Sequence, residues 1–397
     1  MLSNRWCVLA LLFAVRTGMA IQFQAVPALS PLFLKDFAVS IADIGLLIGL
    51  YQAPGIVLAF PGGIIGQRLG DVRAVLTGLG LMIAGGLIMT MAPAWPMQIG
   101  GRLLAGIGGI LINVLLTKMV ADWFAGKELA TAMAIFINSW PFGIALALVA
   151  LPLLADAFGL AAAQSAVAAY LTLALIAFAV LYRAPDAAPK AAGRSVWPGH
   201  AALLGAAMAG LIWGLYNASI GTVFGFGPLM LVERGWTNVA ASSTTSVVLW
   251  LVAFSVPLGG YLADRTGRGS AILLGGLIGF AAALVFSTRT DAVLPAFILL
   301  GLVSGLPAGL IMSLPARILS PETRAAGMGV FFTVFYVMQV AGPWLAGSIA
   351  AAAGTASVSF YLGAFFLCAA CVVLFIFWRL ESVERLRPGV GAPEAVN

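Results

Sequence analysis

Two short stretches of this chain, Gly63-Ile-Ile-Gly-Gln-Arg-Leu-Gly-Asp-Val-Arg73 and Gly260-Tyr-Leu-Ala-Asp-Arg-Thr-Gly-Arg268, resemble each other although they lie in opposite halves of the sequence. Each joins two long apolar runs, and each carries glycines around a basic centre. A second pair of segments repeats in the same order, because Gly106 to Lys118 parallels Gly305 to Arg317. The chain therefore contains an internal repeat of two related halves.

The amino-acid composition indicates that the chain is a membrane protein. Of the 397 residues, 62% are apolar and 9% are charged, and the mean hydropathy is +1.08. Soluble domains have about 45–50% apolar and about 25% charged residues, so a soluble protein is excluded. Disorder needs low hydropathy, and a transmembrane barrel needs alternating apolar and polar residues. The chain has neither, and we predict an all-α polytopic membrane protein.

Twelve apolar runs are long enough to cross a bilayer as helices, which takes about 20 residues each. They divide six and six about a linker rich in Pro, Ala and charges. We predict two pseudo-symmetric six-helix bundles, at 1–182 and 200–380, with a linker at 183–199 and a tail at 381–397. The runs are 6–29, 44–66, 74–91, 98–120, 130–155, 160–182, 201–231, 239–262, 270–287, 293–315, 326–350 and 358–380.

The distribution of Lys and Arg predicts the orientation. With the N-terminus inside, the inner segments hold fifteen of these cations and the outer loops hold three, Lys35, Arg234 and Arg289. Inner loops of membrane proteins carry the excess of positive charge. We therefore expect both termini and the linker in the cytoplasm, in a multi-pass protein of the cytoplasmic (inner) membrane.

The repeated loops resemble a known family. The Gly-x-x-x-Asp-Arg-x-Gly-Arg pattern at 260–268 is similar to the signature loop of the major facilitator superfamily, and Arg102 to Gly109 is similar to its second motif. The resemblance covers the whole chain and implies a monomeric secondary transporter whose helices one, four, seven and ten line the path. Arg16, followed by Val-Pro-x-Leu at 26–29, also resembles the cyanate permease-like branch.

The resemblance marks two groups of residues as gating loops, which would stabilise the outward-facing state. One departure is Gln67, which stands where the signature has Asp, and Asp71 is the nearby acid that could replace it. The family's exporter motif is absent from helix five, where Asn138 to Gly143 stand instead. The gating residues are Gly63, Gln67, Arg68, Gly70 and Asp71 in the first half and Gly260, Asp264, Arg265, Gly267 and Arg268 in the second.

Two arginines fall inside apolar runs, where an ionisable group is costly unless it has a function or a partner. Arg16 lies about 15 Å along its helix from Arg5 at 1.5 Å per residue, near mid-membrane. Arg102 lies nearer the outer face. No Asp or Glu falls deep in a run, so the pair predicts a positive site for an anion, which guanidinium groups bind in bidentate fashion. Arg102 could instead couple conformational changes without touching substrate.

Polar side chains inside other runs could complete the site. In helix seven Trp213 and Asn217 share a face, and in helix eleven Tyr336 and Gln339 lie on one polar stripe. Hydrogen bonding between helices explains any single one of them equally well. The predicted substrate-binding residues are Arg16, Gln24, Arg102, Asn113, Asn217, Tyr336 and Gln339.

Several functions find no support in the residues. His200 is the sole histidine, so we expect no metal site and no histidine relay. No phosphate-binding loop is present, and we expect no cofactor. The cations are scattered without interleaved aromatics, which argues against nucleic acid. The expected partners are the lipid bilayer and a small, anionic substrate.

We therefore predict a secondary active transporter that moves a small anion or organic acid by alternating access. The alternative is an exporter of apolar or cationic compounds, supported by aromatic stretches in helices seven, eleven and twelve. A membrane enzyme or receptor is the third hypothesis, but the runs supply no nucleophile or acid–base pair. We do not expect an enzyme.

Overall fold

The computed structural model describes residues 4–58, 70–91, 94–124, 128–184, 197–320 and 323–385. All regular elements within these ranges are helices, and twelve stretches are long and apolar enough to span a membrane, which confirms the predicted fold class. The first half contains α1 (Arg5–Ala28), α2 (Ser30–Phe37), α3 (Ile41–Leu50), α4 (Pro54–Leu58), α6 (Asp71–Met91), α7 (Trp95–Trp123), α8 (Leu129–Ile137), α9 (Ser139–Phe158) and α10 (Leu160–Leu181).

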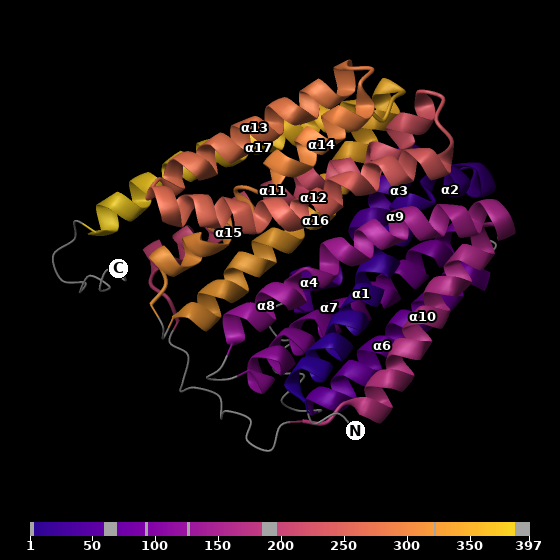
Figure 1. Cartoon of the computed structure of the whole chain (residues 1–397), viewed down its shortest axis with the longest axis horizontal. Helices are drawn as coiled ribbons and strands as arrows, with labels where there is room; N and C mark the ends of the chain where they lie inside the picture. Colours follow the sequence, from indigo (N-terminus) through magenta and orange to yellow (C-terminus); the bar gives the residue numbers. More distant parts are fainter. Residues whose placement is uncertain are drawn as a thin grey trace.

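The second half contains five long helices and one span that is divided into α14, α15 and η1. They are α11 (His200–Glu233), α12 (Asn238–Thr266), α13 (Gly269–Arg289), α14 (Val293–Ser304), α15 (Ala308–Ser313), the 3-10 turn η1 (Leu314–Arg317), α16 (Arg324–Ala353) and α17 (Val358–Arg385). In the first bundle α1 packs on α9 and α10, and α6 packs on α7 and α10; in the second, α11 packs on α16 and α17, and α12 packs on α14 (Figure 1).

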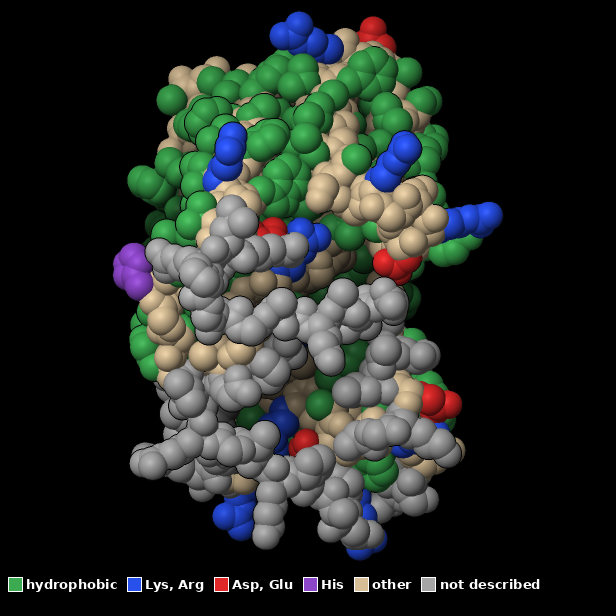
Figure 2. Space-filling model, turned by 90° about the vertical axis from the view of Figure 1, so that its left-hand side faces the viewer, with side chains coloured by type: hydrophobic (Ala, Val, Ile, Leu, Met, Phe, Trp, Pro, Cys, Tyr) green, Lys and Arg blue, Asp and Glu red, His purple; other side chains and the backbone are tan. Residues whose placement is uncertain are grey.

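The start of α1 and the end of α17 lie at one end of the molecule, which we call the terminal end (Figure 1). The loops around 38–40, 159, 234–237, 290–292 and 354–357 lie at the other, the distal end. Lys and Arg side chains are spread over both halves of the terminal face, whereas hydrophobic side chains cover much of the flank (Figure 2). This distribution matches helices whose apolar sides face lipid.

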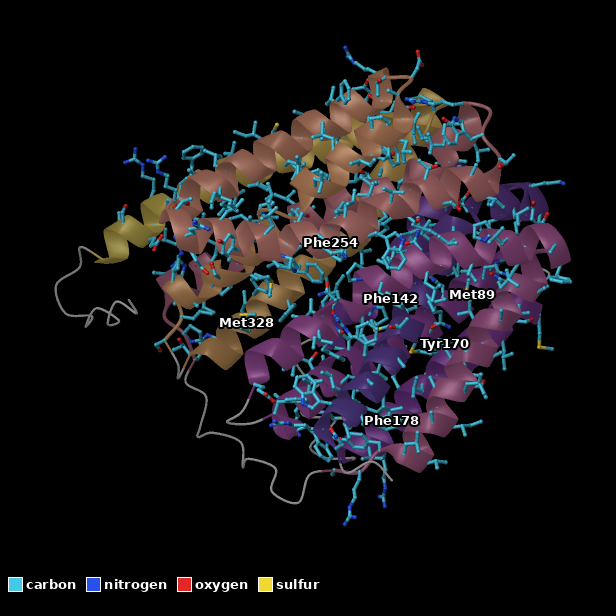
Figure 3. The ribbon with its side chains drawn as sticks, in the orientation of Figure 1. Met89, Phe142, Tyr170, Phe178, Phe254 and Met328 are labelled. Atoms are coloured by element: carbon cyan, nitrogen blue, oxygen red, sulfur yellow. The ribbon has the colours of Figure 1, made fainter. Side chains whose placement is uncertain are left out.

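The two bundles are closed against each other at the distal end. There α3 packs along α16, and a Cβ added to Gly45 would overlap the Pro343 carbonyl oxygen. Glycine is therefore required for this close approach. Toward mid-depth α9 packs on α12, where the Phe142 and Trp250 rings lie 5.5 Å apart. Figure 3 labels Phe142 and Phe254 on the two sides of this boundary.

Elements nearer the terminal end pack within their own bundles. α8 packs on α1, α7 and α9, and α15 packs on α11, α12 and α13. The described contacts between the bundles thus run from the distal end to mid-depth, and mid-depth is where the deep polar residues lie.

Candidate functional site

Arg16 lies in the middle of α1 and reaches across to the junction between α8 and α9. Its Nε donates a hydrogen bond to Asn113 Oδ1 at 3.0 Å. Its Nη1 donates to the carbonyl oxygens of Phe136 and Ile137, at 3.1 and 3.2 Å, and to Ser139 Oγ at 3.3 Å. The guanidinium carbon also lies 4.8 Å from the centre of the Phe136 ring.

Proline chemistry explains why a carbonyl is available to Arg16. In a continuous α-helix the Ile137 carbonyl would accept the N–H of residue 141, but Pro141 has none. The helix is interrupted at this point, at Asn138, and Arg16 supplies the missing donor.

Arg16 keeps unused hydrogen-bonding capacity. Among the described residues, no acceptor is within hydrogen-bond distance of its Nη2, and no Asp or Glu forms an ion pair with it. The side chain is half-buried. A positive group at mid-membrane therefore presents two free N–H bonds and carries an uncompensated charge.

Tyr336 of α16 connects this group to the second bundle. The tyrosine is 5% exposed, and its hydroxyl lies beside the side chain of Asn113 and in the electrostatic field of Arg16. A Cβ on Gly55 would come within 2.5 Å of the tyrosine ring, so the first bundle packs directly on it. The structure thus brings together three of the predicted site residues, from α1, α7 and α16.

Aromatic side chains continue from Tyr336 into the second bundle. The Phe335 ring lies 4.9 Å from the Tyr336 ring, and the Trp213 ring of α11 stacks on Phe335 at 6.3 Å. Phe332 packs edge-on against Phe335 at 6.2 Å. Trp213, Phe332 and Phe335 are half-buried. We call Trp213, Phe332, Phe335 and Tyr336 the aromatic wall; sequence analysis had singled out only two of its members.

Arg102 has a different environment from Arg16. It is 1% exposed, and each of its three nitrogens donates to a backbone carbonyl: Nε to Leu47 at 3.0 Å, Nη1 to Gln22 at 2.8 Å and Nη2 to Phe23 at 2.6 Å. The Phe23 carbonyl is the one that Pro27 leaves without a helical donor. Arg102 joins α1, α3 and α7, and it has no exposed surface to offer a ligand.

Gln24 is also enclosed. Its side chain is 0% exposed, and its Nε2 donates to the Phe224 carbonyl of α11 at 2.8 Å. The Phe224 carbonyl lacks a helical donor because residue 228 is proline. The hydrogen bond therefore crosses between the bundles toward the distal end, where the Phe23 and Phe224 rings lie 6.1 Å apart.

The two remaining predicted residues lie beside the aromatic wall. Asn217 is half-buried and donates to the Trp213 carbonyl, one turn earlier in α11, at 2.8 Å. Gln339 is half-buried on α16, one turn from Phe335, and none of the described residues forms a hydrogen bond with its side chain. Neither side chain forms a hydrogen bond with Arg16.

The second-half signature loop is exposed. Its first residue, Gly260, lies in the last turns of α12. Gly267 caps the end of that helix with φ +63°, a conformation that favours glycine. Arg265 Nη1 donates to the Tyr261 hydroxyl at 2.5 Å, and Asp264 and Arg268 form no ion pair with any other described residue.

In the first-half loop, Gly63, Gln67 and Arg68 lie outside the described residues. Gly70 has φ +80°, and Asp71 begins α6. Asp71 and Asp122 both pair with Lys118. Asp122 lies one helical turn from Lys118, so this pair follows from the sequence spacing. The contact with Asp71 could not be found without the fold.

Arg317, the counterpart of Lys118, pairs with Glu381 of α17 at 3.7 Å. Within the described part of the chain no three His, Cys, Asp or Glu side chains gather into a candidate metal site.

Comparisons with known proteins agree with this architecture. The model of the Major Facilitator Superfamily matches residues 8–243 and 202–395. The lysosomal dipeptide transporter MFSD1 of Danio rerio is 25% identical over 302 residues, which are 67% of this chain and 63% of that protein. The inner membrane transport protein YajR of Escherichia coli K12 is 28% identical over 138 residues, 35% of this chain and 30% of YajR.

A solved structure shares the whole fold. A bacterial homologue of the human lysosomal transporter Spinster, in an inward-facing and occupied conformation, superposes with a TM-score of 0.79 at 16% identity, covering 98% of this chain and 100% of that one.

The chain belongs to the Major Facilitator Superfamily. It is a multi-pass membrane protein, and the relatives that it matches are transporters and not enzymes. The matched region spans less than two thirds of the length of the MFSD1 relative. The superfamily resemblance is confirmed, whereas the narrower resemblance to the cyanate permease-like branch stays a prediction.

Proposed function

We propose that this transporter moves a small organic anion by alternating access and that Arg16 binds the anionic group. The observation that carries the proposal is the unpartnered Nη2 of a half-buried guanidinium at mid-membrane, with no carboxylate beside it among the described residues. An anion at Nη2 would neutralise a charge that is otherwise costly at this depth. Charge-assisted hydrogen bonds to a guanidinium are also among the strongest in proteins.

The same geometry gives the other predicted residues different roles. Asn113 accepts a hydrogen bond from the guanidinium, and Tyr336 lies in its electrostatic field from the second bundle. Both would lie near a bound anion. Asn217 and Gln339 flank the aromatic wall and would contact the rest of the substrate. Arg102 and Gln24 are closed off, and we assign them to joining helices rather than to binding.

The orientation belongs to the same proposal. We place the terminal end in the cytoplasm and the transporter in the cytoplasmic membrane as a monomer, because the terminal end carries most of the cations. The bundles at 1–182 and 200–380 would rock about the site, and the two signature loops would come together when the terminal end closes.

A dipeptide is the second candidate substrate, because the MFSD1 relative is named a dipeptide transporter. The C-terminal carboxylate of a peptide would fit Arg16 Nη2. Its N-terminal ammonium group, however, would find no Asp or Glu in the described part of the site. The exporter alternative requires a cationic or neutral substrate, which the charge of Arg16 disfavours.

The experiment is thermal unfolding of the purified protein with a panel of small carboxylates, dipeptides and neutral or cationic compounds. A ligand at 100 times its Kd should stabilise the protein by about 2.7 kcal/mol. Carboxylates should stabilise the wild type but not Arg16→Gln, whereas the control Arg289→Gln, at an exposed residue, should respond like wild type. Arg16→Lys should also lose the response, because a lysine lacks the planar fork that fixes Nε and Nη1 on Asn113 and Ile137 while Nη2 points at the carboxylate. Stabilisation by neutral or cationic compounds alone, unchanged in Arg16→Gln, would favour the exporter.

A further inference from the structure

The site joins two unlike surfaces, one from each bundle. The first bundle supplies the cation, Arg16, fixed by Asn113 and the helix junction at Asn138. The second bundle supplies the aromatic wall, whose rings follow one another at 4.9 to 6.3 Å. Tyr336 is the member of the wall that packs on the first bundle, at Gly55, and lies in the electrostatic field of Arg16. A ligand at Arg16 Nη2 would therefore lie near the edge of the wall.

The cation has capacity for one negative charge. Nε and Nη1 are already engaged in hydrogen bonds, which leaves the two N–H bonds of Nη2. Arg102, the other deep cation, is 1% exposed and donates from all three nitrogens to backbone carbonyls, so it is enclosed and offers no surface to a ligand. A second negative charge on the substrate would therefore be desolvated without a partner, at a cost of several kcal/mol.

The aromatic wall can contact the part of the substrate that does not carry the charge. Trp213, Phe332 and Phe335 are half-buried at mid-depth, and their partly exposed ring faces and edges can pack against another flat ring. Aliphatic acids of the same charge would gain less from this surface, because ring pairs contribute stabilisation beyond the apolar area that they bury.

We propose that the substrate is a monocarboxylate with a flat, aromatic body, bound with its carboxylate at Arg16 Nη2 and its ring against Trp213 and Phe335. This inference rests on the proposed function, since it specifies what kind of anion Arg16 binds. It also explains why one site combines a cation with an aromatic surface: the two surfaces recognise the two ends of one amphipathic molecule.

The test compares benzoate, phenylacetate, cyclohexanecarboxylate, acetate, phthalate and benzamide as ligands of the purified full-length transporter, with Kd measured by thermal shift titration. Benzoate or phenylacetate should bind at least about tenfold more tightly than acetate, and more tightly than cyclohexanecarboxylate. Phthalate, with two charges, and benzamide, with none, should each bind at least about tenfold more weakly than benzoate.

Variants test the aromatic wall and the cation separately. Trp213→Leu should weaken aromatic acids about fivefold and leave acetate unchanged, whereas Trp344→Leu, at a 48% exposed tryptophan of α16, should change neither. Arg16→Gln should remove the response to every carboxylate.

Two results would contradict the inference while the anion function stands. In both, carboxylates bind the wild type and require Arg16, but either aromatic and aliphatic acids bind equally or phthalate binds best. If Arg16→Gln binds benzoate as the wild type does, the inference and the anion function are both wrong.

Discussion

The hydrogen bond from Gln24 to the Phe224 carbonyl should depend on Pro228, and a double-mutant cycle can measure that dependence. In Gln24→Leu the donor is lost, and the Phe224 carbonyl is left buried without a partner, because Pro228 has no N–H to offer. In Pro228→Ala the helix itself can supply the N–H to this carbonyl. The cost of Gln24→Leu should therefore be large in the wild-type background and small in the Pro228→Ala background.

The structure sets the size of the effect. An unpaired buried carbonyl costs about 1–3 kcal/mol. Gln24→Leu also removes the side-chain oxygen Oε1, which is buried and has no hydrogen bond, and this loss offsets part of the cost. A net destabilisation of about 1–2 kcal/mol is expected when Pro228 is present and below about 0.5 kcal/mol in the Pro228→Ala variant. The resulting coupling of about 1 kcal/mol lies within the range found for hydrogen bonds between membrane helices.

The assay is denaturant unfolding of the four proteins in detergent micelles. Effects of either substitution that do not involve the shared carbonyl cancel in the cycle. Equal costs of Gln24→Leu in the two backgrounds would refute the reasoning, because the amide would then not be replacing the donor that proline lacks. The same cycle on Thr172→Val and Pro228→Ala is a control, since Thr172 of α10 donates to its own helix at the Ala168 carbonyl and should show no coupling.

Three further outcomes follow from described contacts. Arg102→Lys should lower the free energy of unfolding by at least about 1–3 kcal/mol, because a compact ammonium cannot reach all three carbonyls that the planar guanidinium spans and leaves one or more unpaired. An unchanged unfolding midpoint would contradict the assignment of Arg102 to helix joining. Gly45→Ala should weaken the contact between the bundles at the distal end, since the added Cβ would overlap the Pro343 carbonyl oxygen. A cysteine placed in the distal loops should then react faster with a thiol reagent, and unchanged reactivity would contradict the tight contact. Asp71→Asn should cost less than about 1 kcal/mol, because its ion pair with Lys118 is partly exposed, and a larger loss of stability would show that the pair is coupled to more than its local contacts.

The sequence was sufficient for the twelve spans and the two-bundle fold. Hydropathy predicts spanning helices well because nearly all backbone polar groups in a span are satisfied within its own helix, so each segment can be judged by itself. The same locality let the sequence single out Arg16, since a cation near the centre of an apolar run is conspicuous whatever surrounds it. The sequence also shows which carbonyls lack a helical donor because of a proline. It does not show which side chains donate hydrogen bonds to these carbonyls.

The difference between Arg16 and Arg102 required the tertiary structure. Both are arginines within apolar runs, and the sequence could name both as binding residues without separating them. Three carbonyls from α1 and α3 surround Arg102, whereas Arg16 keeps Nη2 without a partner among the described residues. These carbonyls come from residues distant in sequence, and their availability depends on where α1, α3, α7, α8 and α9 meet. Hydropathy measures how much a side chain costs to bury, but only the packing of helices determines which of its hydrogen bonds remain free for a substrate.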